Sequence, residues 1–394
     1  MTCRESKTKP KIIYLCYMPL TQKREKDFFI KEMADVGFLV EYWDLTELYF
    51  QEVSFTGEIE RSYVRKIKDY EELEKLLRAQ YIKQCFFVMI ITYGYRVIKL
   101  YRILTKYKCY LIFFARAGLP IDSLRKSLLR KFFDRPVQYL SFHRLLRAFL
   151  EQFAKFYMYI GLIKQYDLVF ASGTVEASQY NSKSRVVIIN HFDYDECLVT
   201  TEERKSILDH EYCVFLDDNL VYHTDFKILG IKTISATSYF QSLSSFFDLI
   251  EKKLHLKVIV AAHPKANYIG YEFGNRKIIK GKTSELVKNC NFAIAHFSTS
   301  ISFAVLYGKP LLFICTNEMK KMSYFKNIEV FASILDANIL NIDEIYGDTE
   351  LKISGPNLLR YKEYMYRYLT SPATEGRLSA TIFKEHMTNL AASR

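Results

Sequence analysis

Short apolar runs of strand length alternate with longer amphipathic stretches along most of the chain. A strand pattern that alternates with helical patterns is typical of βαβ units and parallel sheets, so the sequence predicts an α/β fold. The expected strands of the first half are Lys11–Tyr17, Leu39–Trp43, Cys85–Ile91, Cys109–Phe114, Leu168–Ala171 and Val186–Asn190, and those of the second half are Tyr212–Leu216, Lys257–Ala262, Phe292–Ala295, Pro310–Phe313 and Glu329–Phe331.

Three of the amphipathic stretches carry clear helix signals. Gln22–Val36 is followed by Gly37, and Ser298–Tyr307 is followed by Gly308. Glycine is common just past the end of a helix because it adopts the left-handed conformation found there. Ser238–Leu254 has apolar residues at helical spacing. We therefore expect helices over these ranges.

The chain is too long for a single hydrophobic core, since cores stop growing at about 250–300 residues. The polar stretch Asp193–His210 separates two strand-rich halves and is the candidate linker. We expect a Rossmann-like N-terminal domain over 1–200 and a Rossmann-like C-terminal domain over 205–355. A helical tail over 356–394 is expected to pack back on the first domain. In such sheets ligands bind at the carboxyl ends of the strands, in a crevice.

Composition and charge narrow the classes of partner. The 394 residues carry a formal net charge of +12 and include 30 Tyr and 30 Phe. This apolar content excludes a disordered chain. The positive charge favours anionic partners such as nucleotide phosphates, an acidic glycan, an anionic membrane or nucleic acid. The alternative is a basic composition without a specific partner.

The N-terminus has no signal-peptide pattern, and the most apolar run, Cys85–Ile98, is too short to span a bilayer. The eight cysteines form no C-x-x-C pair, so free buried thiols are expected and a zinc site is not. These features predict a cytoplasmic protein.

The basic segment Ser123–Lys164, with interleaved Leu, Phe and Tyr, indicates peripheral contact with an anionic membrane. Its alternatives are the solvated face of core helices and a clamp for an acidic glycan.

An acidic pair follows the first expected strand of the second half. Asp217 and Asp218 come directly after Tyr212–Leu216. A carboxylate at that strand end can take a proton from a hydroxyl group as a general base. A second acid beside it raises its pKa by like-charge repulsion. Alternatively, one aspartate caps the following turn and the other is solvated.

A His-Pro dipeptide follows the next strand. Pro264 restricts His263 to an extended or turn conformation, so the imidazole is expected to leave the end of Lys257–Ala262 toward the crevice. There it can donate to a phosphate or a leaving group, and Lys265 adds positive charge. The alternative is a turn histidine without a function.

A hydroxyl cluster follows the third strand and opens an expected helix. Ser298, Thr299 and Ser300 come just after His296. Hydroxyls and backbone N–H groups at a helix start form an anion site. Simple capping is the alternative, but capping needs only one such residue. The sequence therefore predicts a phosphate site here.

An acidic pair, a His-Pro dipeptide and a Ser/Thr element, in this order, resemble the bacterial sialyltransferases and the Kdo transferases of capsule and lipopolysaccharide assembly. Two Rossmann-like domains joined by a linker also match the glycosyltransferase fold called GT-B. The resemblance covers Tyr212–Phe313, and it departs from the sialyltransferase pattern at Asn219, where those enzymes have Gly. It implies transfer of a nonulosonic acid, such as Kdo or sialic acid, from a CMP donor to a glycan or glycolipid acceptor.

The resemblance also implies roles for individual residues. Asp217, with Asp218 beside it, would be the general base, and His263 would bind the donor phosphate and assist the departure of CMP. No cofactor or metal is required in the families resembled. The residues assigned to the phosphate and the nucleoside are His263, Pro264, Lys265, Thr283, Glu285, His296, Ser298, Thr299 and Ser300.

Other functions remain as alternatives. A GT-B transferase could use a UDP-sugar, a ribofuranosyl donor or a CDP-polyol, and a non-catalytic glycan-assembly or binding protein could retain the fold. Nucleic-acid binding is disfavoured because no zinc-finger, RNP or GXXG signature occurs. The stretch Gly281-Lys282-Thr283 lacks the earlier glycine of a P-loop, and no G-x-G-x-x-G fingerprint indicates a dehydrogenase.

Overall fold

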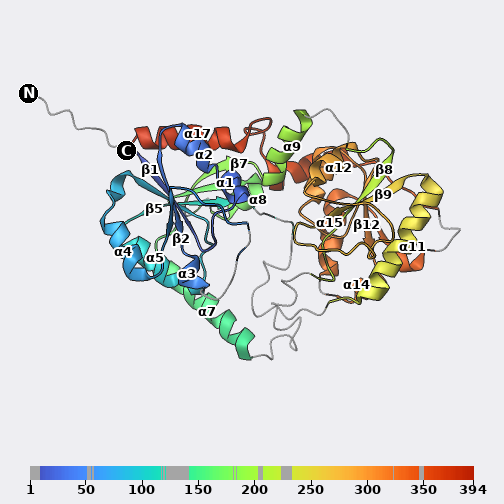
Figure 1. The fold of residues 1–394 in the computed structure, drawn as a ribbon, viewed down its shortest axis with the longest axis horizontal. Coiled ribbons are helices and arrows are strands. Elements are labelled where there is room, and N and C mark those ends of the chain that lie inside the picture. Colours follow the sequence, from blue (N-terminus) through green and yellow to red (C-terminus); the bar gives the residue numbers. More distant parts are fainter. Residues whose placement is uncertain are drawn as a thin grey trace, which may run out of the picture. The chain divides into compact units, whose positions relative to one another are not determined.

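The computed structural model describes residues 9–50, 57–116, 142–180, 184–202, 207–222, 233–322, 324–345 and 350–394, with a few isolated positions between them. These residues form two compact units, each built on its own sheet (Figure 1). The first unit contains the chain up to Arg116, the part from α7 (Phe142–Tyr159) to Asn190, and Ala373–Arg394. The second unit is His191–Pro372.

The first unit has a seven-stranded parallel sheet in the order β3-β2-β1-β4-β5-β6-β7. The first six positions of this order, 3-2-1-4-5-6, are those of a Rossmann sheet. Its strands are β1 (Lys11–Cys16), β2 (Leu39–Asp44), β3 (Val64–Lys66), β4 (Cys85–Met89), β5 (Tyr110–Ala115), β6 (Leu168–Ser172) and β7 (Arg185–Ile189), and its helices include α1 (Gln22–Asp27), α2 (Ile30–Asp35), α3 (Thr46–Tyr49), α4 (Tyr70–Arg78), α5 (Ile98–Lys106), α8 (Gly173–Ser178) and α17 (Ser379–Ala392).

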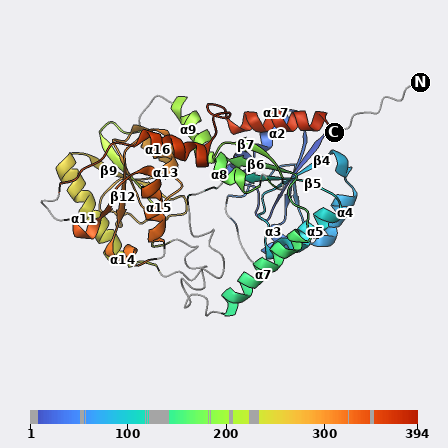
Figure 2. The ribbon, with the colours of Figure 1, turned by 180° about the vertical axis from the view of Figure 1, so that it is seen from behind.

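Both faces of this sheet are covered, which explains why its strands are apolar without alternation. On β1, Ile12 and Tyr14 belong to one core cluster, whereas Ile13 and Leu15 belong to the other. The first cluster lies under α2 and α17, which run side by side in both views (Figures 1 and 2). The second cluster contains residues of α4 and α5.

The second unit has a six-stranded parallel sheet in the order β10-β9-β8-β11-β12-β13, which is again the Rossmann order 3-2-1-4-5-6. Helix α11 packs on β9, while α9, α12 and α13 pack against one another on the other side of the sheet (Figure 1). The elements are α9 (Phe192–Glu202), β8 (Tyr212–Leu216), α11 (Ala236–Leu254), β9 (Lys257–Ala262), β10 (Ile278–Lys280), α12 (Thr283–Asn289), β11 (Ala293–Ala295), α13 (Ile301–Leu306), β12 (Leu311–Cys315), α14 (Asn317–Lys320), α15 (Phe325–Leu335), β13 (Ile339–Asn341), α16 (Leu358–Tyr364) and the π-helical turn η6 (Met365–Leu369).

Two expected elements differ in the structure. The helix expected over Gln22–Val36 is broken into α1 and α2, because Phe29 has a left-handed backbone (φ 56°) that an α-helix cannot contain. The strand expected over Glu329–Phe331 is wrong, since these residues lie within α15. That helix buries Ile328, Phe331 and Leu335, which lie on one helical face.

The division into units also differs from the expected boundaries. The expected linker Asp193–His210 begins with α9, which belongs to the second unit and packs against α12 and α13. The first unit therefore stops at Asn190 rather than near residue 200. The tail expected over 356–394 is divided, because α16 and η6 belong to the second unit and only Ala373–Arg394 belongs to the first.

The basic segment Ser123–Lys164 is described only from residue 142 onward; its earlier part lies outside the described residues. The described part is α7 and the turn that follows it. No helix among the described residues has the length and apolar character needed to cross a membrane.

The cysteines that the structure describes are all buried, and none of them forms a disulfide. Three of them belong to the first unit and four to the second. They are Cys16, Cys85, Cys109, Cys197, Cys213, Cys290 and Cys315.

Candidate functional site

The three sequence motifs come together at the carboxyl ends of three neighbouring strands in the second unit. Leu216 of β8 pairs with Ala261 of β9 on one side and with Ala295 of β11 on the other. All three strands therefore end at one level of the sheet. The order of the sheet reverses between β8 and β11, and ligands bind at such switch points in open α/β sheets.

The Asp217 carboxylate joins two of these strand ends. Its Oδ2 accepts the backbone N–H of His263 at 3.0 Å, and its Oδ1 accepts the backbone N–H of Asn219 at 2.8 Å. The Tyr268 hydroxyl lies 2.9 and 2.8 Å from the two oxygens and donates to them. Burial raises the pKa of this carboxyl, although the hydrogen bonds from His263, Asn219 and Tyr268 lower it. Asp217 thus holds the His-Pro loop against the end of β8.

Asp218 makes the connection on the other side. Its Oδ2 accepts the backbone N–H of Phe297 at 3.1 Å, directly after β11. Burial raises the pKa of Asp218 well above its usual value, and the nearby charge of Asp217 raises it further. The two aspartates therefore tie the loops after β9 and β11 to the end of β8, one on each side.

Asn219 lies at the point where the chain turns away from these strands. Its backbone is left-handed, with φ 51°. Glycine adopts this conformation without steric cost, and asparagine is among the few other residues that tolerate it. Asn219 can therefore make this turn with a backbone that glycine would adopt equally well.

His263 is oriented by its own loop. The backbone N–H of Lys265 donates to Nδ1 of the His263 ring at 3.1 Å. Because Nδ1 accepts, the proton of the neutral ring is on Nε2, which becomes the donor. The ring is half-buried, and the side chains of Pro264 and Lys265 are exposed. A histidine held in this way can donate to an anion at the sheet edge.

His296 is not at the surface of the site as expected. Its ring is fully buried, with Nε2 2.8 Å from the Tyr239 hydroxyl and Nδ1 2.8 Å from the Ile314 carbonyl oxygen. Burial lowers the pKa of His296 to about 4, so the ring is neutral at pH 7. The side chain therefore links β11 to α11 and β12 and supports the loop that follows it.

The hydroxyl cluster precedes its helix instead of opening it. Helix α13 begins at Ile301, and Ser298 and Thr299 lie in the turn before it. The Ser300 hydroxyl lies 2.8 Å from the Ser298 hydroxyl, so part of the cluster is paired internally. Thr299 is exposed, and the two serines are half-buried. The turn keeps hydroxyls at the end of β11, next to Phe297 and Asp218.

Thr283 and Glu285 lie further along the same edge. They begin α12, which follows β10, and β9 separates that strand from β8. Glu285 pairs with Lys282 at 2.6 Å. No hydrogen bond or ion pair between described residues connects Thr283 or Glu285 to the three central motifs.

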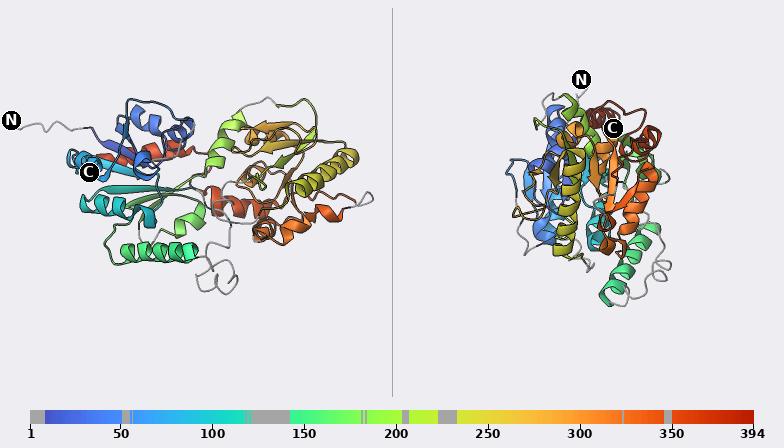
Figure 3. Two further views of the ribbon diagram at one scale, coloured as in Figure 1. Left: turned by 60° about the horizontal axis from the view of Figure 1, so that its bottom comes forward. Right: turned by 90° about the vertical axis from the view of Figure 1, so that its right-hand side faces the viewer.

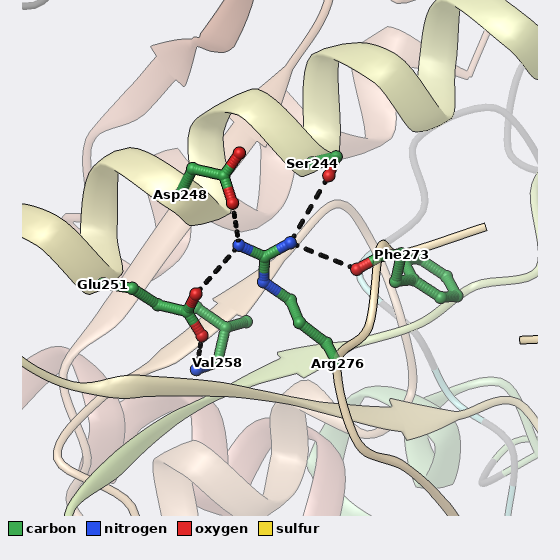
Figure 4. Close-up of polar contacts among 6 residues, drawn as sticks. All are labelled: Ser244, Asp248, Glu251, Val258, Phe273 and Arg276. Carbon is green, nitrogen blue, oxygen red and sulfur yellow. Dashed lines mark hydrogen bonds and ion pairs between the residues drawn. The ribbon is translucent and has the colours of Figure 1, made fainter. Parts of the chain in front are cut away.

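Helix α11 is anchored at both ends, which positions the residues that it brings to the site. Near its start, Tyr239 contacts His296. Near its end, the buried Arg276 guanidinium contacts Asp248 at 2.6 Å and Glu251 at 3.0 Å (Figure 4). The same guanidinium donates to the Phe273 carbonyl oxygen, and Glu251 accepts the backbone N–H of Val258 in β9.

Sequence reasoning missed two tyrosines that organise the site. Tyr268 follows the His-Pro dipeptide in a loop with no motif, and Tyr239 lies inside an amphipathic helix where it is expected only to fill the core. Their roles depend on contacts with Asp217 and His296, which are distant in the chain. Among the residues that the structure describes, no group of three or more His, Cys, Asp or Glu side chains is placed to hold a metal ion.

Comparison with known proteins supports the architecture. No protein-family model and no curated protein sequence matches the chain. A solved UDP-N-acetylglucosamine 2-epimerase matches with 13% identity and a TM-score of 0.51, covering 98% of this chain and 97% of that chain. The fold is of the GT-B type. This confirms the expected α/β arrangement of two Rossmann-like domains, and at this identity the likeness shows the fold alone.

A glycosyltransferase and a polymerase are also similar, with lower TM-scores. The glycosyltransferase SnogD from Streptomyces nogalater matches with 10% identity and a TM-score of 0.46, covering 98% of this chain and 100% of that chain. The wall teichoic acid polymerase TagF matches with 10% identity and a TM-score of 0.49, covering 98% of this chain and 90% of that chain.

Proposed function

We propose that this protein is a glycosyltransferase that takes a sugar from a nucleotide-activated donor. One observation carries the proposal: the acidic pair, the His-Pro loop and the hydroxyl turn converge at the switch point of the second sheet. The two aspartates hold the three loops together through backbone hydrogen bonds. The donor's phosphate binds at this edge of the sheet.

His263 is the residue that we assign to the leaving group. Its Nε2–H donates to a phosphate oxygen of the donor, because Nδ1 is occupied by the Lys265 N–H. In the transfer, the bond between the anomeric carbon and the phosphate oxygen breaks, and the acceptor's hydroxyl oxygen bonds to that carbon. The nucleotide leaves with the electron pair, and the hydroxyl proton passes to solvent water. Donation by His263 and the charge of Lys265 stabilise the phosphate as it leaves.

Asp217 acts as a positioning residue in this proposal. As a base it would have to reach an acceptor hydroxyl, but it is buried and both of its oxygens accept hydrogen bonds. Its burial-raised pKa would favour the base role expected from the resemblance. The geometry favours the other role, in which the carboxylate fixes the backbone of His263.

The finer part of the proposal is a CMP donor that carries a nonulosonic acid, with a surface glycan as acceptor. The order of the motifs supports it, as does Asn219, whose left-handed backbone is the conformation for which glycine is preferred. UDP-sugars, ribofuranosyl donors and CDP-polyols are the competing donors. Binding of different nucleotides distinguishes these classes.

Thermal unfolding with millimolar CMP, UMP, UDP, GDP or CDP tests the proposal. A ligand at 100 times its Kd stabilises a protein by about 2.7 kcal/mol, which is a readable shift. We expect CMP to raise the unfolding temperature of the second unit, and His263→Ala to remove that shift. The exposed His210 of the same unit provides the matched control, so His210→Ala should keep it.

The outcomes separate the two parts of the proposal. A shift with UDP or GDP instead of CMP would retain the nucleotide site and exclude the CMP donor. No shift with any nucleotide would contradict the proposed transferase and favour a non-catalytic binding or assembly protein.

The positioning role of Asp217 is tested through Tyr268. Tyr268→Phe removes a donor to both carboxylate oxygens, which should destabilise the fold by about 1–3 kcal/mol. Nucleotide affinity should fall together with the transfer rate, because the His263 loop loses its support. Tyr271→Phe, at a nearby tyrosine that is 84% exposed, should change neither. If Tyr268→Phe binds the nucleotide as tightly as the wild type, the positioning role is wrong.

A further inference from the structure

The outer face of α7 is apolar. Leu146, Phe149, Phe153, Phe156 and Ile160 recur at spacings of three and four residues, which places them on one side of a helix. Their exposed fractions are 44%, 65%, 42%, 53% and 47%. Tyr159, the last residue of α7, and Leu162, just after it, are exposed as well. We call these seven residues the α7 stripe; large apolar side chains so grouped mark an interaction surface.

The opposite face of α7 is fixed to the first unit. The Tyr93 hydroxyl donates to the Ala154 carbonyl oxygen at 2.7 Å, and Ala154 is buried. The Glu151 carboxylate lies against Gly94 in the segment before η2 (Tyr95–Val97). Figures 1 and 3 show α7 on the outside of this unit. Glu151, the acidic residue of α7, therefore lies on the anchored face, and the stripe lies on the outer face.

Exposed cations lie on α7 itself and on the elements next to it. Lys155 of α7 is exposed, and the contacting η2 and its continuation α5 carry the exposed Arg96, Lys99 and Arg102. These three recur every three residues and share one side of their helix. In the sequence, the segment Ser123–Lys164 has nine Lys and Arg against two Asp and Glu, and the structure describes this segment only from residue 142 onward.

We propose that the α7 stripe inserts into the surface of an anionic lipid bilayer, with α7 lying parallel to the membrane. Apolar and aromatic side chains on one helix face, flanked by cations, are the features that bind a helix to the interface of such a bilayer. The positive surroundings match anionic headgroups, and the aromatic side chains match the interfacial region. This proposal does not depend on the proposed transferase activity.

Binding to vesicles tests the proposal with the full chain. We expect the protein to co-sediment with phosphatidylcholine vesicles that contain about 30 mol% phosphatidylglycerol, and not with pure phosphatidylcholine vesicles. Raising NaCl from about 0.1 M to about 0.5 M should weaken the binding, since salt screens the headgroup charge. Failure to bind the anionic vesicles, or equal binding to both kinds, would overturn the proposal.

Substitution of the stripe identifies the surface that binds. A triple variant with Phe149→Ser, Phe153→Ser and Phe156→Ser should lose at least about tenfold in partitioning, because three inserted rings are removed. The matched control is the pair Leu358→Ser and Leu359→Ser on α16, which are also exposed, and it should bind as the wild type does. Unchanged binding of the triple variant would assign the bilayer contact to another surface.

Fluorescence reports insertion without removing the stripe. The chain has a single Trp, and Trp43 is fully buried in the core. Phe153→Trp should shift its emission to shorter wavelength when anionic vesicles are added, whereas Leu359→Trp should not. An unshifted Phe153→Trp would overturn the proposal. A second result would also overturn it. If the wild type is a dimer in solution and binds no vesicles, and the triple serine variant is a monomer, the stripe contacts a second copy of the chain instead of a bilayer.

Discussion

At the scale of single residues, Asp217 and Asp218 show how burial is compensated at the end of β8. Asp217 accepts hydrogen bonds from two backbone N–H groups and one tyrosine. Asp218 accepts the N–H of Phe297, and its pKa is raised well above the usual value by burial. A buried carboxylate with few partners destabilises the fold when it is ionised. This local cost is typical of sites that bind ligands.

The raised pKa of Asp218 predicts a pH dependence of stability. Between the unfolded-state value, near 3.8, and the higher folded-state value, the folded chain binds more protons. Stability therefore falls as the pH rises through this window. Asp218→Asn keeps an acceptor for Phe297 and removes the charge. We expect the variant to unfold at a higher temperature than the wild type at pH 8, with the difference shrinking as the pH approaches 4.

Thermal unfolding of both proteins from pH 4 to pH 8 checks this expectation. Each unit by which the folded-state pKa exceeds the unfolded one corresponds to about 1.4 kcal/mol. Asp35→Asn changes an exposed aspartate of α2 and should leave the profile unchanged. A variant that is less stable than the wild type at pH 8 would show that the Asp218 charge is compensated in the folded protein.

At this scale the sequence predicted the positions of the main polar groups, but not all of their surroundings. Asp217 and His263 follow apolar strands directly, so their place at the sheet edge could be predicted from the pattern. His296 follows a strand in the same way, yet its ring is buried against Tyr239, which lies 57 positions away in the chain. Such a contact depends on how α11 packs, and no local pattern in the sequence encodes it.

At the scale of elements, the Arg276 contacts hold α11 to the strand that follows it. Arg276 lies in the connection before β10, and its guanidinium contacts Asp248 and Glu251 of α11 (Figure 4). The guanidinium also lies over the Phe247 ring, 5.4 Å from its centre. Because Glu251 accepts the N–H of Val258 as well, helix, strand and connection meet at one cluster.

Arg276→Met should therefore destabilise the second unit by about 1–3 kcal/mol, mainly because the partly buried Glu251 and the Phe273 carbonyl lose a charged donor, whereas the exposed Asp248 contributes little. Lys252→Met changes an exposed cation of the same helix and should alter the free energy of unfolding by less than about 0.5 kcal/mol. Urea unfolding of both variants measures the difference. If the two variants have the same free energy of unfolding, the Arg276 contacts contribute no more to stability than an exposed cation does.

The elements that the sequence failed to predict have physical reasons. Strands β3, β10 and β13 are three residues long, and each of them lies at an edge of its sheet. They lack the apolar runs by which the central strands were predicted. The break between α1 and α2 depends on the left-handed backbone of Phe29, which its side chain does not favour.

At the scale of the whole molecule, each unit has a core of its own, and the end of the chain belongs to the first. Phe383 of α17 is fully buried against Phe29, Phe114 and Phe170, with ring centres 5.7, 5.1 and 4.9 Å away. The first core thus depends on residues that follow the second unit in sequence. Folding of the first unit is complete only when the last helix has joined it.

Phe383→Ala should lower the stability of the first unit by about 3–5 kcal/mol, through lost contacts and a cavity. The unfolding of the second unit, and any nucleotide-induced shift, should be unchanged. Phe247→Ala removes an equally buried ring from the second unit and should show the reverse pattern. Calorimetry separates the two transitions. If both variants lower both transitions alike, the units do not unfold independently.

The buried cysteines make it possible to measure how often each unit opens. Cys16, Cys85 and Cys109 report on the first unit, and Cys197, Cys213, Cys290 and Cys315 report on the second. A thiol in the core reacts with a small alkylating reagent only when its surroundings open. Pulsed alkylation followed by peptide mass spectrometry would therefore time the opening of each unit separately. The native cysteines therefore serve as probes of opening in each unit, and no label has to be introduced.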